Sequence, residues 1–427
     1  MNKSSGTDAI APPQSQNILW RKVWALTALQ GTITLSWVFY KLYLKSLLVD
    51  FGLPENMAAG ILLLEDALAV VIEPLMGGLS DGSMRWMGTR FPFISAGVIL
   101  SSALFVSIPT LTTFVEPEPD SWVRWLLPGL LVMWSLAMTV FRSPALTLLG
   151  KYASPRNLPK ASSLLTLVGG IIVAIAPISN QFILGLGPGP TFTIASISML
   201  GTAAVLRAVD ATETTASGSS NESSNLEEPP IAQEADKPVA AQPKHLFLAL
   251  ALIFVTSITL SWGSGFLMET LKSLIAELGG NVQWLTFAVA IALALTAVPA
   301  GYWAERLGNR LAMLIGIGPC MGLLLLMGFV PNGAIFAIAA IGLVAFFNLV
   351  RNGGLPLAIS LVPPQRIGLA IGIYTAGIKA AGILKGTAFS PFGEMNLVKG
   401  AIAGSIAFVA ASSFIAASRL VQPADSV

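Results

Sequence analysis

Twelve long apolar runs, each bounded by proline, glycine or charged residues, are the feature that most constrains the fold of this chain. A helix needs about 20 apolar residues to cross the hydrocarbon core of a bilayer, so each run predicts one spanning helix. The runs lie at 23–47, 57–78, 92–113, 125–147, 161–184, 191–207, 246–270, 282–302, 311–330, 333–354, 368–390 and 396–418. Only 11% of the 427 residues are charged, against about 25% in soluble proteins. The sequence therefore predicts an all-α, multi-pass integral membrane protein and excludes a soluble enzyme, a nucleic-acid-binding protein and a disordered chain.

The distribution of basic residues predicts how the chain lies in the membrane. An even number of spans places both termini on one side. Basic residues near the span ends of the opposite side are Lys45, Arg124, Lys272 and Lys399. Those near the span ends on the side of the termini are Arg21, Lys22, Arg85, Arg90, Lys151, Arg156, Lys160, Arg207, Lys244, Arg306, Arg310, Arg366 and Arg419. Cytoplasmic loops carry the excess of lysine and arginine, and the first residues show no signal-peptide pattern. We therefore expect both termini in the cytoplasm and the protein in a bacterial inner membrane.

Residues 208–244 differ sharply in composition from the apolar runs on either side. The stretch from Thr212 to Pro243 is rich in Ser, Thr, Glu, Ala and Pro and has almost no large apolar residues. Such a stretch cannot bury enough apolar surface to fold, so it predicts a disordered cytosolic linker. The expected organisation is a cytosolic tail (1–22), a six-helix bundle (23–207), the linker (208–244), a second six-helix bundle (245–418) and a cytosolic tail (419–427).

The two halves of the sequence repeat each other. Ile-Thr-Leu-Ser-Trp occurs at 33–37 in the first span and again at 258–262 in the seventh. Further matches follow in the same order: Gly77 with Gly301, Asp81 with Glu305, Arg142 with Arg351, and Pro155 with Pro364. Ordered matches of this kind predict two pseudo-symmetric halves with a binding site between them at the middle of the membrane.

A motif of glycine, acidic and basic residues follows the second span and is repeated after the eighth. Its residues are Gly77, Asp81, Arg85, Gly88 and Arg90 in the first half and Gly301, Glu305, Arg306, Gly308 and Arg310 in the second. The motif resembles that of the major facilitator superfamily. The wide spacing from Asp81 to Gly88, followed by Pro92 and Phe93, resembles the sucrose-transporter and glycoside–cation symporter branch. The segment 368–372 is also similar to bacteriochlorophyll-delivery members of the superfamily.

The resemblance implies the major facilitator fold, in which twelve transmembrane helices form two pseudo-symmetric six-helix halves that give alternating access to a central site. It also implies that Asp81 lies close to the start of the eleventh span. There the positive end of a helix dipole and a pairing arginine, Arg85 or Arg90, stabilise a carboxylate. We therefore expect the motif residues to form a gate; the alternative is a solvated basic loop without a gating role.

The second predicted span carries three acids, and three basic residues in other spans match them in depth. A charge at membrane depth costs about 2.5–3.5 kcal/mol, so each needs a partner or a function. With a helical rise of about 1.5 Å per residue, the matching pairs are Glu73 with Arg142, Asp66 with Lys379, and Glu65 with Lys41.

These pairs suggest two roles. We expect Glu73 and Arg142 to form a structural or gating pair. Asp66 or Glu65 is the candidate for proton binding, because a carboxylate in a low-dielectric site with a breakable cationic partner, here Lys379, suits binding and release of a proton. The alternative is that all three pairs are static and fix the helix register.

Aromatic and polar residues near the middle of the membrane are candidates for the substrate cavity. Trp37 and Trp262 occupy equivalent positions in the repeat, and an indole ring stacks on a sugar or on a flat apolar ligand. Tyr40, Asn348 and Arg351 are candidates for polar contacts. Helix packing is the alternative for the tryptophans.

These features predict a monomeric secondary transporter of a small organic solute, coupled to protons, with a sugar-like compound as the first candidate. One alternative is efflux of amphipathic compounds. The other is a non-transporting factor that binds or delivers a pigment, for which His245 is a poor axial ligand. The chain has a single cysteine, Cys320, and a single histidine. We expect no cofactor, no metal site, no nucleic-acid partner and no enzyme activity.

Overall fold

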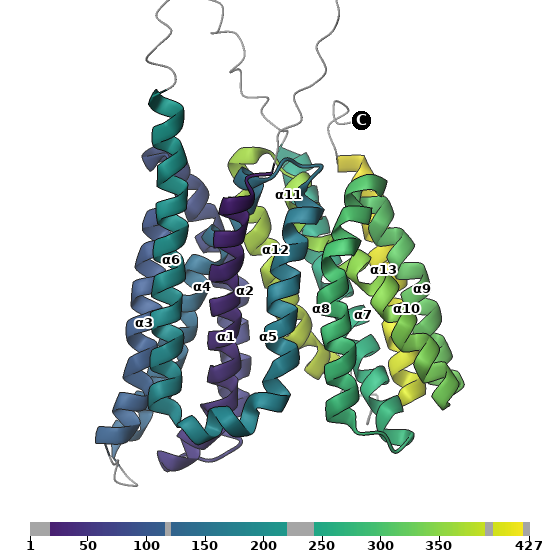
Figure 1. Ribbon diagram of the computed structural model, residues 1–427, viewed down its shortest axis with the longest axis horizontal. Helices are drawn as coiled ribbons and strands as arrows, with labels where there is room; N and C mark the ends of the chain where they lie inside the picture. Colours follow the sequence, from purple (N-terminus) through teal and green to yellow (C-terminus); the bar gives the residue numbers. More distant parts are fainter. Residues whose placement is uncertain (1–17, 116–120, 220–242, 389–395, 422–427) are drawn as a thin grey trace, which may run out of the picture.

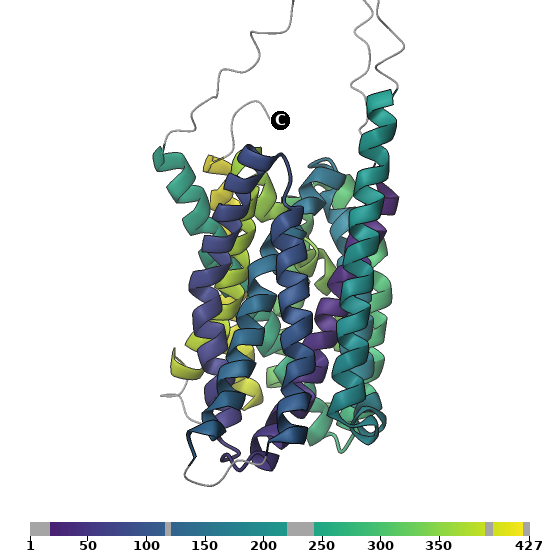
Figure 2. The same ribbon diagram turned by 90° about the vertical axis from the view of Figure 1, so that its left-hand side faces the viewer.

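The computed structural model describes residues 18–115, 121–219, 243–388 and 396–421. Within these ranges every regular element is a helix. The long helices stand side by side with their axes roughly vertical in both views (Figures 1 and 2). Buried apolar side chains form one large cluster mainly in the N-terminal half and another in the C-terminal half, so each half has its own core.

Each of the twelve predicted spans coincides with one long helix. The first half contains α1 Trp20–Asp50, α2 Met57–Met87, α3 Phe91–Phe114, α4 Leu126–Tyr152, α5 Leu158–Leu186 and α6 Pro188–Ser219. The second half contains α7 Pro243–Glu277, α8 Val282–Leu307, α9 Asn309–Phe329, α10 Gly333–Arg351, the short α11 Gly354–Ser360, α12 Ile367–Ala388 and α13 Leu397–Ala417. We call the end of the molecule where α6 ends and α7 begins the linker end; it is at the top of Figure 1.

Ten of the described helices are long and apolar enough to cross a membrane. The two long helices outside this group are α1 and α2. The charged residues of α2 include Glu65 and Glu73, which are only 2% and 1% exposed. The two acids are covered by neighbouring helices and not by lipid, so α2 can lie within the membrane despite its charge.

The end of α6 corrects the expected boundary of the linker. α6 continues through Ser219, so residues 208–219 are helical, and α7 begins at Pro243. No proline or glycine occurs between Thr202 and Ser217 to end the helix. Asp210 also ties this part of α6 to its neighbours, because it forms ion pairs with Lys22 of α1 at 3.4 Å and Lys151 of α4 at 3.2 Å. Residues 220–242 of the expected linker lie outside the described residues.

Two further elements differ from the expectation. α2 continues through Met87, so much of the motif expected in a loop lies on a helix. The apolar run marks where the membrane ends and not where the backbone hydrogen bonds end; Gly88, with φ of 66°, ends α2. The short α11 was not predicted, because its seven residues are too few to give a periodic pattern.

The two halves meet along two helix pairs, α2 with α12 and α5 with α8. A Cβ atom at Gly77 would collide with the backbone of Gly368, and one at Gly301 would collide with Ser163 and come within 3.1 Å of the carbonyl of Pro159. The alignment of Pro155 with Pro364 also pairs Pro159 with Gly368. One close backbone contact therefore occurs twice, at positions related by the internal repeat, and glycine is required because it has no side chain.

Candidate functional site

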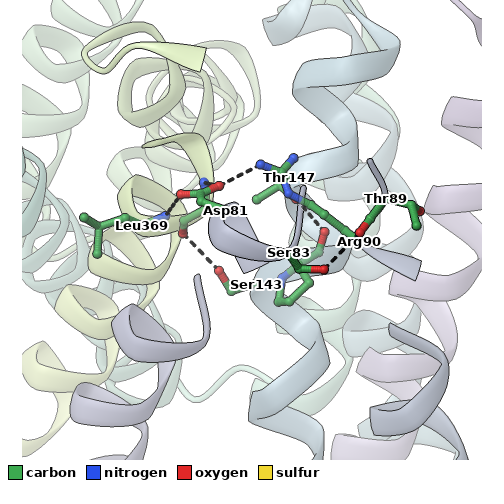
Figure 3. Close-up of polar contacts among 9 residues, drawn as sticks. Asp81, Ser83, Thr89, Arg90, Ser143, Thr147 and Leu369 are labelled. Atoms are coloured by element: carbon green, nitrogen blue, oxygen red, sulfur yellow. Dashed lines mark hydrogen bonds and ion pairs between the residues drawn. The ribbon is translucent and has the colours of Figure 1, made fainter. Parts of the chain in front are cut away.

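Asp81 on α2 binds the first turn of α12, in the other half of the molecule. Its two carboxylate oxygens accept hydrogen bonds of 2.9 Å from the backbone N–H groups of Gly368 and Leu369. Arg90 donates a further bond of 2.6 Å to the same carboxylate, and Figure 3 shows Asp81 between Leu369 and Arg90. These N–H groups have no partner within their own helix, and the helix dipole favours an anion there. We call Asp81 with these three donors the α2–α12 latch.

The turn after α2 directs Arg90 back to Asp81. Gly88 adopts the left-handed conformation, and the hydroxyl of Ser83 donates a 3.1 Å hydrogen bond to the carbonyl of Thr89 (Figure 3). This closed turn accounts for the wide spacing between Asp81 and Gly88. Of the two arginines considered from the sequence, Arg90 is the partner of Asp81, and Arg85 is exposed.

The motif copy in the second half links the halves in a different way. Glu305 on α8 lies 3.5 Å from Nζ of Lys160 on α5. The alignment that pairs Asp81 with Glu305 also pairs Leu369 with Lys160, so a side-chain ion pair occupies the place of the backbone latch. Arg306 is exposed. Arg310 donates a 2.9 Å bond to the carbonyl of Ser418, within the second half.

Two of the three pairs matched by depth are within ion-pair distance. Asp66 lies 2.6 Å from Nζ of Lys379, so this pair joins α2 to α12 across the two halves. Glu73 lies 3.5 Å from Nη1 of Arg142, so this pair joins α2 to α4 within one half. The two differ in exposure: the side chain of Asp66 is 35% exposed and that of Glu73 is 1% exposed.

Glu65 has a different neighbour from the one expected. It accepts a hydrogen bond from the hydroxyl of Tyr40, and its other carboxylate oxygen has no hydrogen-bond partner within the described residues. Lys41, the expected partner, is exposed. In the described parts of α1 and α2, Lys41 and Glu65 form no ion pair within 4.0 Å. Successive residues of a helix point about 100° apart, so Tyr40 and not Lys41 faces α2.

A cavity of about 520 Å³ lies between helices α5, α7, α8, α10 and α12. Two of the predicted cavity residues, Asn348 and Arg351, line it. Asn348 also donates hydrogen bonds to the Leu293 carbonyl at 2.6 Å and to the Thr296 hydroxyl at 3.0 Å. Asn348 therefore links α10 to α8. Arg351 is the predicted cavity residue that stays exposed.

The other predicted cavity residues pack helices together and are not among the lining residues. Trp262 donates a 2.8 Å hydrogen bond to the carbonyl of Ala381 and so ties α7 to α12. Trp37 and Tyr40 pack against Trp134 of α4, with ring centroids 5.0 Å and 4.5 Å away. The interpretation of Trp37, Trp262 and Tyr40 as cavity residues is therefore wrong for this cavity. The repeat locates equivalent positions, but it does not say which side of each helix faces the cavity.

Several lining residues were missed by the sequence analysis. Ser257, Ser261 and Ser264 of α7 line the cavity, and their spacing of four and three residues places them on one face of the helix. This polar stripe on an apolar helix is a signal that could have located the cavity. Tyr374 of α12 also lines it, and no pattern around this residue distinguishes it.

Solved structures share this arrangement of helices. The crystal structure of a bacterial homologue of the iron transporter ferroportin in the outward-facing state is 15% identical, with a TM-score of 0.66; the match covers 93% of this chain and 99% of that one. The proton:xylose symporter XylE bound to 6-bromo-6-deoxy-D-glucose, a major facilitator superfamily protein, is 13% identical, with a TM-score of 0.64 and coverage of 95% of each chain. At these identities the likeness shows the fold, and it confirms the predicted major facilitator fold.

The sequence comparisons place the chain in a family. No curated protein matches the chain at the level of sequence. The family model for MFS/sugar transport proteins matches residues 25–363, which reach from α1 in the first half to beyond α11 in the second. The prediction of a multi-pass major facilitator protein is thus confirmed, and the chain belongs to the MFS/sugar transport protein family.

Proposed function

We propose that the protein is a proton-coupled secondary transporter that moves a small organic solute across the membrane by alternating access. The observation that carries this proposal is the Asp66–Lys379 ion pair, which joins the two halves at membrane depth. Both side chains are partly accessible, at 35% and 21%. Water and protons can therefore reach a bond that has to break when α2 and α12 separate.

The contacts at the linker end support a rocking cycle. The α2–α12 latch and the Glu305–Lys160 pair both join the halves at this end. The cavity instead extends toward Lys272 and Thr286, near the opposite ends of α7 and α8. We take this arrangement as the state that is closed at the linker end. With that end in the cytoplasm, as the basic residues predict, it is the outward-facing state.

Proton binding to α2 is the proposed coupling step. A proton from the outer solution binds the carboxylate of Asp66, which removes the attraction between Asp66 and Lys379 and lowers the cost of separating α2 from α12. When the linker end opens, the proton leaves to the cytoplasm and the ion pair forms again. Glu65 is the second candidate, because it is buried next to Asp66 and one of its oxygens has no partner within the described residues.

A sugar-like solute is the first candidate for the substrate. This candidate rests on the description of the family and on one similar structure, that of a proton:xylose symporter bound to 6-bromo-6-deoxy-D-glucose. We propose a monomer as the working unit. Efflux of an amphipathic compound uses the same cycle in the opposite direction. Delivery of a pigment requires that pigment copurify with the solubilised protein.

The proposal is tested by uptake into proteoliposomes that contain the full chain. Sugars, amino acids and dyes are screened with and without an imposed pH gradient. An acidic outer solution is expected to drive accumulation of at least one solute. Asp66→Asn or Glu65→Gln is expected to abolish accumulation while solute exchange continues, because only the coupling step is lost.

Glu55→Gln is the matched control, since it removes an acid from an exposed pair with Lys45 at the surface. This variant is expected to accumulate solute as the unmodified protein does. The coupling proposal is wrong if no transported solute responds to the pH gradient, or if Asp66→Asn and Glu65→Gln both still accumulate solute against its gradient.

A further inference from the structure

The cavity contains an arginine that has no acidic partner among the described residues. Arg351, the last residue of α10, lines the cavity with an exposed side chain. In the described ranges of the chain no carboxylate lies within 4.0 Å of its guanidinium. Lys272 lies at the opposite end of the cavity, and none of the lining residues is acidic. The cavity as a whole is therefore positively charged.

The internal repeat explains why Arg351 has no acidic partner within the described part of the chain. Arg351 aligns with Arg142, which pairs with Glu73 at 3.5 Å. The alignment of Gly77 with Gly301 pairs Glu73 with position 297, which is an alanine. Ala297 is completely buried. The second half thus has the arginine of the pair without the acid.

The same alignment accounts for the open space in front of Arg351. Glu65 and Asp66 of α2 align with Val289 and Ala290 of α8, and both of these residues line the cavity. On the other side, Lys379 of α12 aligns with Gly170 of α5, which is also a lining residue. Small side chains therefore leave room in the second half where charged side chains fill the first.

An unpaired guanidinium at membrane depth is costly, and its planar donors fit a carboxylate or phosphate in a bidentate manner. Tyr374 lies beside Arg351, close enough for electrostatic interaction. The hydroxyls of Ser257, Ser261 and Ser264 line the same cavity.

We propose that the substrate is an organic anion with a hydroxyl-bearing body, whose carboxylate or phosphate binds Arg351. The inference rests on the proposed function in one respect, that this cavity is the transport site. For a sugar-like solute it specifies a sugar acid or a sugar phosphate.

The test is thermal stabilisation of the detergent-solubilised full chain by three matched compounds: glucose, glucuronate and glucose 6-phosphate. At least one of the two anions is expected to raise the melting temperature in a saturable manner, and glucose is not. The two anions distinguish a carboxylate from a phosphate. Arg351→Gln is expected to weaken the apparent affinity for the bound anion by about tenfold or more, because a desolvated charge pair is lost.

Two variants separate this effect from a loss of folding. Ala290→Asp places a carboxylate in the cavity beside an intact Arg351, and it is expected to weaken anion binding as well. Arg207→Gln removes an exposed arginine of α6 outside the cavity, and it is expected to leave the affinity unchanged.

The inference is overturned if glucose stabilises the protein as well as the anions do. It is equally overturned if neither anion stabilises the protein, or if Arg351→Gln binds the anion with unchanged affinity. Uptake of a neutral solute driven by a pH gradient would remove the anion proposal alone and would leave proton-coupled transport standing. Anion binding that depends on Arg351, together with transport that does not depend on pH, would remove proton coupling alone and would leave the anion proposal standing.

Discussion

Individual residues of α2 make ion pairs that differ in their surroundings. Glu73 is 1% exposed, and its partner Arg142 is 27% exposed. Asp66 and Lys379 are both accessible to water. Removing one partner of a buried pair leaves an uncompensated charge and costs about 3–5 kcal/mol, whereas an exposed pair contributes about 1 kcal/mol or less. A static role therefore suits Glu73–Arg142, and a role in which the pair breaks and forms suits Asp66–Lys379.

Arg142→Gln is expected to destabilise the protein by about 3 kcal/mol, because it leaves the carboxylate of Glu73 buried without its cation. The double variant Glu73→Gln/Arg142→Gln is expected to recover most of this loss, since no buried charge remains. Thermal unfolding of the purified variants in detergent measures both effects. A double variant that is no more stable than Arg142→Gln alone would contradict the static pairing.

Charge pairs are easier to predict from the sequence than the side chains that face a cavity. The helical rise and the ends of the apolar runs give the depth of each charge, and Asp66 with Lys379 is one of the pairs that depth matches. The direction in which a side chain points around the helix axis relative to its neighbours depends on how the helices pack. For this reason the partner of Glu65 is Tyr40 and not Lys41, and Trp262 binds the backbone of α12.

At the level of helices, α2 and α12 pack closely because their backbones touch at positions that have no side chain. A Cβ atom at Gly77 or at Gly372 would collide with the backbone of the opposite helix. Gly82, five residues further along α2, has no atom within 4 Å of the position that its Cβ would take. The two helices can therefore approach closely only where glycine occurs.

Gly77→Ala is expected to push α2 and α12 apart at the linker end and to weaken the α2–α12 latch. Gly82→Ala is the matched control, since the same methyl group meets open space there. Solute uptake and thermal stability are measured for both variants. We expect clear losses of both in Gly77→Ala and values close to those of the unmodified protein in Gly82→Ala. Equal behaviour of the two variants would show that the close contact is not needed.

Helix existence was predictable from the apolar runs, but helix ends and the cavity were not. α2 and α6 continue beyond their apolar runs, where hydropathy gives no signal. The cavity depends on small residues such as Gly170 and Ala290, which are common throughout the spans. Their role becomes clear only when the residues aligned by the repeat are compared in the packed helices.

At the level of the whole molecule, the latch and its counterpart hold the linker end closed. Asp81→Asn keeps the size of the side chain and removes its charge, so the bonds to α12 and to Arg90 are weakened. We expect the balance between the two states to shift toward opening of the linker end. The readout is Ser163, a buried residue of α5 that contacts Gly301 of α8.

The opening is measured as the rate of maleimide labelling of Ser163→Cys in detergent, in a background where the single cysteine is removed by Cys320→Ala. Adding Asp81→Asn is expected to raise the labelling rate by about tenfold, the effect of losing one charge-assisted hydrogen bond. Arg156→Cys, at an exposed position, controls for the reactivity of the reagent and is expected to label equally with and without Asp81→Asn. An unchanged rate at Ser163→Cys would contradict the gating role of Asp81.

The most direct test of proton coupling is to record the external pH of a proteoliposome suspension when a transported solute is added. The account predicts that solute entry carries protons inward and makes the outer medium more alkaline. It further predicts that Asp66→Asn or Glu65→Gln abolishes this alkalinisation while solute exchange continues. Solute uptake without any pH change in the unmodified protein, or the same pH change in both variants, would contradict it.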